Sequence, residues 1–94
     1  MRIEWLFEAR NDLMSIREYI ARDNPRTVQD IARRILQTTI CLRDHPGVGR
    51  PGRIYGTREL VIPGLPYIVP YRVKRGSIEI LGVLHGARQW PDDL

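Results

Sequence analysis

The sequence of 94 residues predicts an α+β domain, in which an antiparallel helical hairpin packs on a small antiparallel sheet in the order β-α-α-β-β-β. Two patterns predict this fold. Apolar residues recur at helical spacing through residues 9–42, and three short β-rich segments with Gly/Pro turns follow between residues 57 and 84. This length makes one domain, 1–94: residues 1–45 form a strand and the hairpin, residues 57–84 a three-stranded meander, and residues 85–94 a tail.

The N-terminal segment Arg2–Leu6 alternates in polarity, so we expect a short strand that joins an edge of the sheet. The period then becomes helical, because apolar residues follow at intervals of four, three and four positions: Ala9, Leu13, Ile16 and Ile20. Asn24 is expected to cap a second helix with Pro25 at its first position, and that helix should end near Arg43. So short a turn makes the two helices antiparallel.

Residues 46–56, PGVGRPGRIYG, contain four glycines and two prolines and are expected to form a loop. They are not a phosphate-binding P-loop, since no Gly-Lys-Ser/Thr follows. Strands are expected at Thr57–Ile62, Tyr67–Val73 and Ser77–Leu84. Pro70 has no N–H for the middle strand's ladder, so it predicts a bulge or a position whose N–H side faces away from a partner.

Composition excludes several classes of protein. The apolar fraction of 43% is that of a folded domain, and no apolar run is long enough to span a membrane. The N-terminus lacks the apolar middle of a secretory signal, and the lone Cys41 makes no internal disulfide. No Cys/His cluster has zinc spacing, so we expect a cytoplasmic protein without metal or cofactor.

The net charge is +4, and fourteen of the fifteen basic residues are arginine. Residues 46–91 carry seven basic and two acidic groups, whereas residues 1–45 are close to balance. Arginine suits phosphates, carboxylates and aromatic faces, so the second half could meet nucleic acid or an acidic protein segment. A merely solvated arginine-rich surface is the alternative.

The stretch VLHGARQW (Val83–Trp90) ends the last expected strand and raises the question of catalysis. Four polar residues are expected to share the open sheet face and its rim: Arg58, Arg72, His85 and Arg88. Hydrolysis of a phosphodiester without metal needs a general base, a general acid and cations, which His85 and arginines could supply. Only Glu59 and Glu79 are acidic between residue 46 and the tail, too few for two-metal chemistry. A histidine with a purely structural role is the alternative.

The same region could instead dock a protein. Tyr, Trp and Arg are frequent interface hot spots, and five such residues could form one patch: Arg58, Tyr71, Arg72, Arg88 and Trp90. Trp90 could equally cap the core. A nucleic-acid-binding module is a third class, supported only weakly by Tyr67, Tyr71 and Arg72, because no recognised DNA- or RNA-binding motif is present.

Three strings follow the hairpin in order: GTRELVI (Gly56–Ile62), PYIVPYRV (Pro66–Val73) and IEILGVLHGARQWP (Ile78–Pro91). Together they resemble the RelE/ParE superfamily of toxins from bacterial type II toxin–antitoxin systems, over essentially the whole chain. The family fold is the one expected above.

The resemblance implies one of two activities. RelE-like members are ribosome-dependent endoribonucleases that cut mRNA in the A site, whereas ParE-like members poison DNA gyrase. Nuclease members usually have an arginine after the middle-strand tyrosine, where this chain has Ile68. Members resembling RelE also carry lysines on the preceding strand, where this chain has Glu59 and Val61. Lost cations weaken transition-state stabilisation, so the pattern favours gyrase inhibition with no catalytic residue. The alternative is a ribonuclease that uses Arg72, His85 and Arg88; a non-toxic member that still binds an antitoxin also remains possible.

The resemblance further implies growth inhibition, a role in plasmid stabilisation, and a hetero-oligomeric complex with a cognate, ParD-like antitoxin whose disordered tail folds on the toxin. The residues expected to bind this antitoxin, some of them partly exposed in the free toxin, are Leu13, Ile16, Ile20, Arg53 and Arg58. The residues expected to dock on the target are Arg58, Tyr71, Arg72, His85, Arg88 and Trp90.

Overall fold

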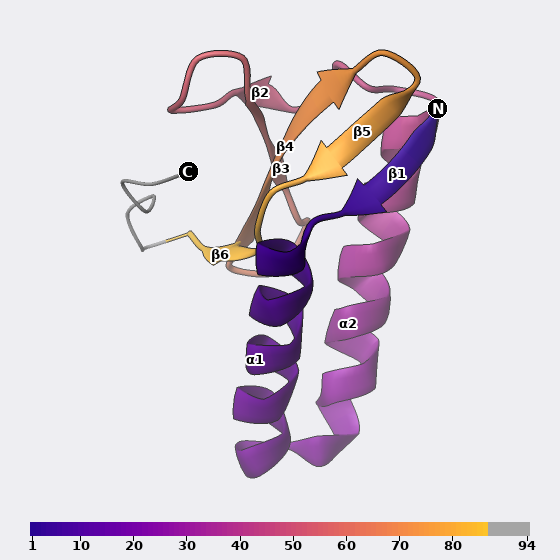
Figure 1. Ribbon diagram of the computed structural model, residues 1–94. Coiled ribbons are helices and arrows are strands. Elements are labelled where there is room, and N and C mark those ends of the chain that lie inside the picture. The colour runs from indigo at the N-terminus through magenta and orange to yellow at the C-terminus, as the bar shows by residue number, and fades with distance from the viewer. Residues whose placement is uncertain (87–94) are drawn as a thin grey trace.

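Two antiparallel helices lie against one face of a β-sheet (Figure 1). The turn that connects the two helices lies beyond the end of the sheet. The computed structural model describes residues 1–86. In chain order the elements are β1 (Arg2–Trp5), α1 (Phe7–Asp23), α2 (Pro25–Ile40), the 3-10 turn η1 (Cys41–Arg43), β2 (Arg50–Pro51), β3 (Arg58–Val61), β4 (Tyr67–Lys74), β5 (Ser77–Ile80) and β6 (Leu84–His85). The predicted α+β class and the helical hairpin are confirmed.

The strands follow the order β1-β5-β4-β3-β2, and β6 pairs with β4. The three central strands β3, β4 and β5 are antiparallel neighbours, as the meander prediction required. β1 joins the edge beside β5 but runs parallel to it, which makes the sheet mixed. The hairpin and strands β2, β3 and β4 all lie between β1 and β5 in the chain, which gives the long connection that a parallel pairing needs.

The last predicted strand, Ser77–Leu84, is wrong as a continuous element, because it is interrupted at residues 81–83. Tyr71 pairs with Ile80 and Ile68 pairs with Leu84, so three residues (81–83) lie opposite two (69 and 70). This is the bulge that Pro70 predicts: its carbonyl accepts a hydrogen bond from the N–H of Leu81 (2.9 Å), but it has no N–H to return.

The hairpin starts earlier than predicted, at Phe7, and ends at Arg43 as expected. Asn24 does occupy the N-cap of α2, but its side chain makes no capping bond. The backbone of Asn24 forms the hydrogen bonds at this turn. Its N–H donates to the carbonyl of Ile20 (2.8 Å), and its carbonyl accepts from the hydroxyl of Thr27 (3.1 Å). One residue therefore ends α1 and begins α2, which keeps the two helices antiparallel.

The core lies between the helices and the sheet. Its largest fully buried side chains come from both layers: Tyr71, Ile35, Leu42, Ile62, Ile78, Ile80 and Val69. The hydroxyl of Tyr71 accepts from the N–H of Gly49 (2.9 Å) and donates to the carbonyl of Pro46 (2.8 Å), so it ties the loop before β2 to the sheet. A Cβ on Gly49 would lie 2.6 Å from that hydroxyl oxygen, so only glycine fits there.

Candidate functional site

The face of the sheet that the helices leave open carries paired charges. Arg72 on β4 donates from Nε to Glu79 Oε1 on β5 (2.5 Å), and Arg50 on β2 does the same to Glu59 on β3 (2.9 Å). Both pairs follow the strand register, since Arg72 lies opposite Glu79 and Arg50 opposite Glu59. Each arginine therefore meets a carboxylate on its neighbouring strand.

Glu79 is the centre of this charge pattern. The hydrogen bond from Arg72 lowers the pKa of Glu79, desolvation by neighbouring groups opposes that shift, and the charges of Arg72 and Lys74 add to it. The ammonium of Lys74 lies 3.6 Å from the same carboxylate oxygen. A carboxylate shared by two cations stays ionised and reduces the positive potential of this face.

His85 lies in a groove on the opposite, helix-covered side. It pairs with Tyr67, and the two rings meet edge to face with centroids 5.9 Å apart and an interplanar angle of 85°. The groove has a volume of about 680 Å³. Side chains from α1, β4 and the bulge line it: Asp12, Ser15, Ile16, Tyr19, Tyr67, Val83, Leu84 and His85.

Asp12 joins α1 to the segment before β6 at this groove, and the sequence analysis did not predict this role. Its Oδ2 accepts a hydrogen bond from the backbone N–H of Val83 (3.0 Å), within the bulge before β6. The signal was visible in the sequence, because Asp12 follows Ala9 by three positions and precedes Ile16 by four, and so interrupts the apolar stripe of the first helix with a carboxylate.

Two of the three residues that a ribonuclease would use are far apart. Tyr67 and Arg72 are five positions apart on β4, so they lie on opposite faces and roughly 17 Å from each other. His85 lies beside Tyr67, and Arg72 lies with Glu79 on the open face. Arg88 falls outside the described residues 1–86.

The predicted target-docking patch needs one correction. Tyr71 is fully buried, and both hydrogen-bonding capacities of its hydroxyl are used within the fold, so it is not part of a surface. Tyr71 was predicted to dock on the target, but its side chain lies on the face of β4 that the helices cover. Arg58 is half-buried and donates to the carbonyls of Gly47 (3.2 Å) and Gly49 (2.8 Å). Trp90, like Arg88, lies outside the described residues.

The residues predicted to bind an antitoxin lie on two parts of the molecule. Leu13, Ile16 and Ile20 are half-buried on α1, which is the partial exposure that the prediction required, and Ile16 lines the groove of His85. Arg53 is exposed in the loop between β2 and β3, away from these three residues. Tyr55 of that loop is fully solvent-exposed, and its surface position had not been predicted.

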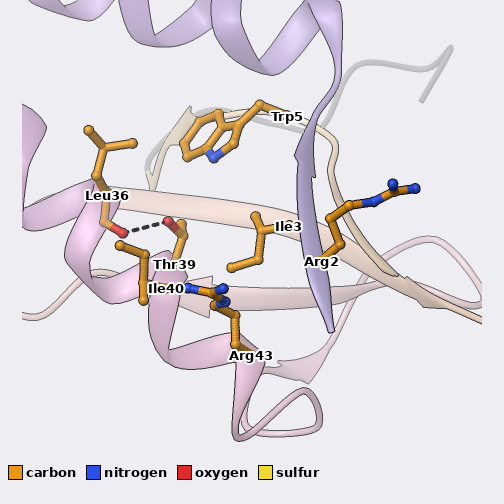
Figure 2. Close-up of a pocket in the computed structure, with 7 residues that line it drawn as sticks. All are labelled: Arg2, Ile3, Trp5, Leu36, Thr39, Ile40 and Arg43. Carbon is orange, nitrogen blue, oxygen red and sulfur yellow. Dashed lines mark hydrogen bonds between the residues drawn. The ribbon is translucent and has the colours of Figure 1, made fainter. Parts of the chain in front are cut away.

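A second groove, also missed by the sequence prediction, lies between β1 and the end of α2, with a volume of about 360 Å³. It is lined by Arg2, Ile3, Trp5, Leu36, Thr39, Ile40 and Arg43. Figure 2 shows Ile3 and Trp5 projecting from β1 toward α2, whereas Arg2 projects away. Leu36 and Ile40 keep 41% and 52% of their surface exposed, so the groove has an apolar wall open to solvent.

Residues 1–86 hold no group of three or more His, Cys, Asp or Glu side chains arranged to bind a metal ion. Neither helix of this part of the chain has the length and apolar character needed to cross a membrane.

Comparison with known proteins identifies the family. Residues 3–90 match the family described as "ParE toxin of type II toxin-antitoxin system, parDE". Among curated relatives, "Putative toxin Y4kP" of Sinorhizobium fredii is 44% identical over 99% of this chain and 96% of its own length. "Toxin RelE2" of Caulobacter vibrioides is 31% identical over 93% of this chain and 97% of its own.

Solved structures agree with the sequence relatives. The structure described as "Chromosomal ParDE TA system from P. aeruginosa" superposes with a TM-score of 0.82 at 28% identity, over 88% of this chain and 92% of that one. The "YoeB/ParE toxin from Agrobacterium tumefaciens" shares the fold, with a TM-score of 0.58 at 19% identity over 88% and 95% of the two chains. The chain therefore belongs to the ParE toxin family of type II toxin–antitoxin systems.

Proposed function

We propose that this toxin inhibits DNA gyrase by binding to it in the cytoplasm, and that a cognate, ParD-like antitoxin neutralises the toxin by covering it. The family match supports a ParE-type activity, and the similar structure from P. aeruginosa is described as a ParDE system. Gyrase inhibition of this kind needs a docking surface and no catalytic group on the toxin.

One observation carries the choice of a binding protein over a ribonuclease. Arg72 and His85 lie on opposite faces of the sheet, and Arg72 is paired with Glu79. Cleavage of RNA would require a base and a cation within reach of one phosphate, about 3 Å from the reacting atoms. His85 lies beside Tyr67, which is roughly 17 Å along β4 from Arg72. This separation supports a binding protein over a ribonuclease that uses both Arg72 and His85.

The first experiment is a gyrase supercoiling assay with purified toxin, freed of antitoxin and shown to be folded by circular dichroism. We expect inhibition of supercoiling and trapped, cleaved DNA, both relieved by adding the antitoxin. The variant His85→Ala should inhibit to a similar extent. No inhibition at micromolar toxin would contradict the proposal.

A ribosome-dependent ribonuclease is the second candidate. It is favoured by the relative named "Toxin RelE2" and by the exposed position of His85 beside Tyr67 in a groove. Primer extension on mRNA bound in the ribosomal A site tests it directly. Cleavage that disappears in His85→Ala, while antitoxin binding persists, would establish this function in place of gyrase inhibition.

A further inference from the structure

Two turns carry exposed arginines at one end of the sheet. Residues 52–57 join β2 to β3, and the turn Arg75–Gly76 joins β4 to β5. Because β3 and β4 are antiparallel neighbours, the start of β3 and the end of β4 lie at the same end of the sheet, and so do the two turns. Figure 1 shows this end away from the turn between the two helices. Neighbouring strands are about 4.8 Å apart, so the two turns are centred roughly 10 Å apart.

The arginines of these turns have no carboxylate partner, whereas the strand arginines described above are each paired with a glutamate. Arg53 and Arg75 are exposed, and neither forms an ion pair within residues 1–86. Lys74, at the end of β4, lies 3.6 Å from Glu79 and keeps 53% of its side chain exposed. Neither turn contains an acidic residue. The positive charge at this end is therefore accessible to an anion.

The turn between β2 and β3 has a well-defined backbone. The N–H of Gly52 donates to the carbonyl of Thr57 (2.8 Å), and the N–H and hydroxyl of Thr57 both donate to the carbonyl of Ile54 (3.1 and 2.5 Å). Gly56 has a positive φ of 83°, which residues with a side chain rarely adopt. Tyr55 is fully solvent-exposed on this turn. Because the backbone is already ordered, less conformational entropy is lost when the exposed side chains bind a partner.

The combination of arginine and an exposed tyrosine suits the backbone of a nucleic acid. Guanidinium groups neutralise phosphates, and a tyrosine can donate its hydroxyl to a phosphate oxygen or pack its ring on a base. Duplex DNA carries one phosphate charge per about 1.7 Å of its axis, so separate cations can each meet a different phosphate. Protein hot spots are instead typically anchored in pockets, and neither groove described above includes a residue of these turns.

We infer that the basic end of the sheet, defined by Arg53, Tyr55, Lys74 and Arg75, binds the phosphate backbone of duplex DNA and holds the toxin against the DNA in its complex with gyrase. The inference rests on the proposed function, because gyrase brings the DNA that the toxin would contact. It adds a second partner to a mechanism that otherwise needs only the protein target. Phosphate contacts carry no sequence information, so this binding would be independent of DNA sequence.

The salt dependence of DNA binding tests the role of the arginines. Full-length toxin freed of antitoxin is titrated into a short, fluorescently labelled DNA duplex, and anisotropy gives the binding constant. Arg53→Gln and Arg75→Gln should each reduce the slope of the log binding constant against log salt concentration by about 0.9. Arg33→Gln, which removes the same charge from an exposed position on α2, is the matched control and should leave the slope unchanged. Equal reductions in all three variants, or no binding by the parent toxin at low salt, would overturn the inference.

Tyr55 is tested in the same titration. Tyr55→Ala should weaken duplex binding by at least roughly threefold without changing the salt slope, because it removes a contact but no charge. Tyr19→Ala is the matched control, since Tyr19 is 67% exposed on α1. Equal losses from the two variants would overturn the role of Tyr55.

Two other polyanions identify the occupant of the basic end of the sheet. An RNA duplex of the same sequence represents ribosomal RNA, and a polyglutamate peptide represents an acidic protein segment. We expect the DNA duplex to bind more tightly than polyglutamate and at least as tightly as the RNA duplex. Preference for polyglutamate would assign this end to a protein partner, and preference for RNA would assign it to the ribosome; either result would overturn the inference.

The supercoiling assay connects the DNA contact to gyrase. The double variant Arg53→Gln/Arg75→Gln, shown to be folded by circular dichroism, should require at least roughly tenfold more toxin than the parent for equal inhibition. Equal inhibition by the two proteins would overturn the inference and leave the proposed function standing. Inhibition by neither protein, with duplex binding retained, would contradict the proposed function but not the DNA contact.

Discussion

The hydroxyl of Tyr71 joins two parts of the molecule that are distant in sequence. It satisfies the buried N–H of Gly49 and donates to the carbonyl of Pro46, while its ring fills the core beneath the sheet. Burial raises the pKa of Tyr71, partly offset by the hydrogen bond from Gly49 and the charge of Arg58. Tyr71 therefore stabilises the fold and does not contribute to a binding surface.

We expect Tyr71→Phe to lower the free energy of unfolding by about 1–3 kcal/mol, because it leaves the buried Gly49 N–H without an acceptor. Urea unfolding at neutral pH measures this change. Since Tyr71 is away from the surface, the folded variant should bind the antitoxin as the parent does. Unchanged stability would mean that water replaces the hydroxyl at no cost.

Asp12 accepts a hydrogen bond from the backbone N–H of Val83, 71 residues further along the chain. We expect Asp12→Ala to cost about 1–3 kcal/mol of unfolding free energy, because the Val83 N–H loses a charged acceptor. Asp12→Asn, which keeps an acceptor oxygen, should lose less. Urea unfolding compares the three proteins, and exchange of the Val83 amide reports whether the bulge opens locally. Equal stability of the alanine and asparagine variants would contradict this role.

Site residues were predictable only where their neighbours are local in sequence. Strand alternation can predict which side chains of β4 share a face, but not which of the two faces the helices cover. Tyr71 was therefore predicted to lie on the surface, whereas it is buried. Arg72 lies on β4 and His85 on β6. Which face of the sheet His85 shares with β4 depends on the register of β6, which the bulge shifts relative to β5. The sequence predicts Ile40 and Leu36 only as helix residues. Their place in a groove depends on the position of β1 beside α2, which the sequence does not give.

At the scale of elements, β4 and β5 are joined by the ion pair of Arg72 and Glu79 on their open face. The hydrogen bond from Arg72 holds the pKa of Glu79 below its ordinary value of 4.5. The ionised carboxylate therefore stabilises the folded state at a pH above the unfolded-state pKa, and this contribution is lost as the pH falls through the lower, folded-state pKa.

We accordingly expect the stability of the parent protein to fall more steeply below about pH 5 than that of Glu79→Gln. Arg72→Gln should also make stability depend less on pH in this acidic range, since it removes the main cause of the lowered Glu79 pKa. The double variant should differ little from either single variant in this pH dependence. Urea unfolding between neutral and acidic pH gives these slopes. If Glu79→Gln lost stability with falling pH as steeply as the parent protein, other carboxylates would account for the acid dependence.

The elements themselves were largely predictable, because each depends on local spacing. The helices follow from their apolar period, the turn at Asn24-Pro25 from its residues, and the bulge from Pro70. The parallel pairing of β1 with β5 was not predictable, since Arg2–Trp5 carries no signal of direction. The break at residues 81–83 was hidden because those residues are apolar and buried like the strand before them.

At the scale of the whole molecule, a net charge of +4 affects how fast partners arrive. We expect the association rate of toxin and antitoxin to fall by about tenfold or more between roughly 50 and 500 mM salt, because screening shortens the reach of the toxin's field. The dissociation rate should change less, since it depends mainly on short-range contacts, which salt screens little. Stopped-flow association and competition-based dissociation separate the two rates. A salt-independent association rate would show that charge does not guide the encounter.

The parallel pairing of β1 with β5 also bears on synthesis. The strand Arg2–Trp5 is translated long before its partner Ser77–Ile80, because both helices and strands β2 to β4 lie between them in the chain. Closing so long a loop is slow, and the contacts that reward it form only when both ends are present. A nascent chain that stops before Ser77 can form its helical hairpin but has no neighbour for its first strand. The sheet of this toxin is thus completed only after β5 and β6 have been translated, and shorter nascent chains lack both the pairing of β1 and the bulge before His85.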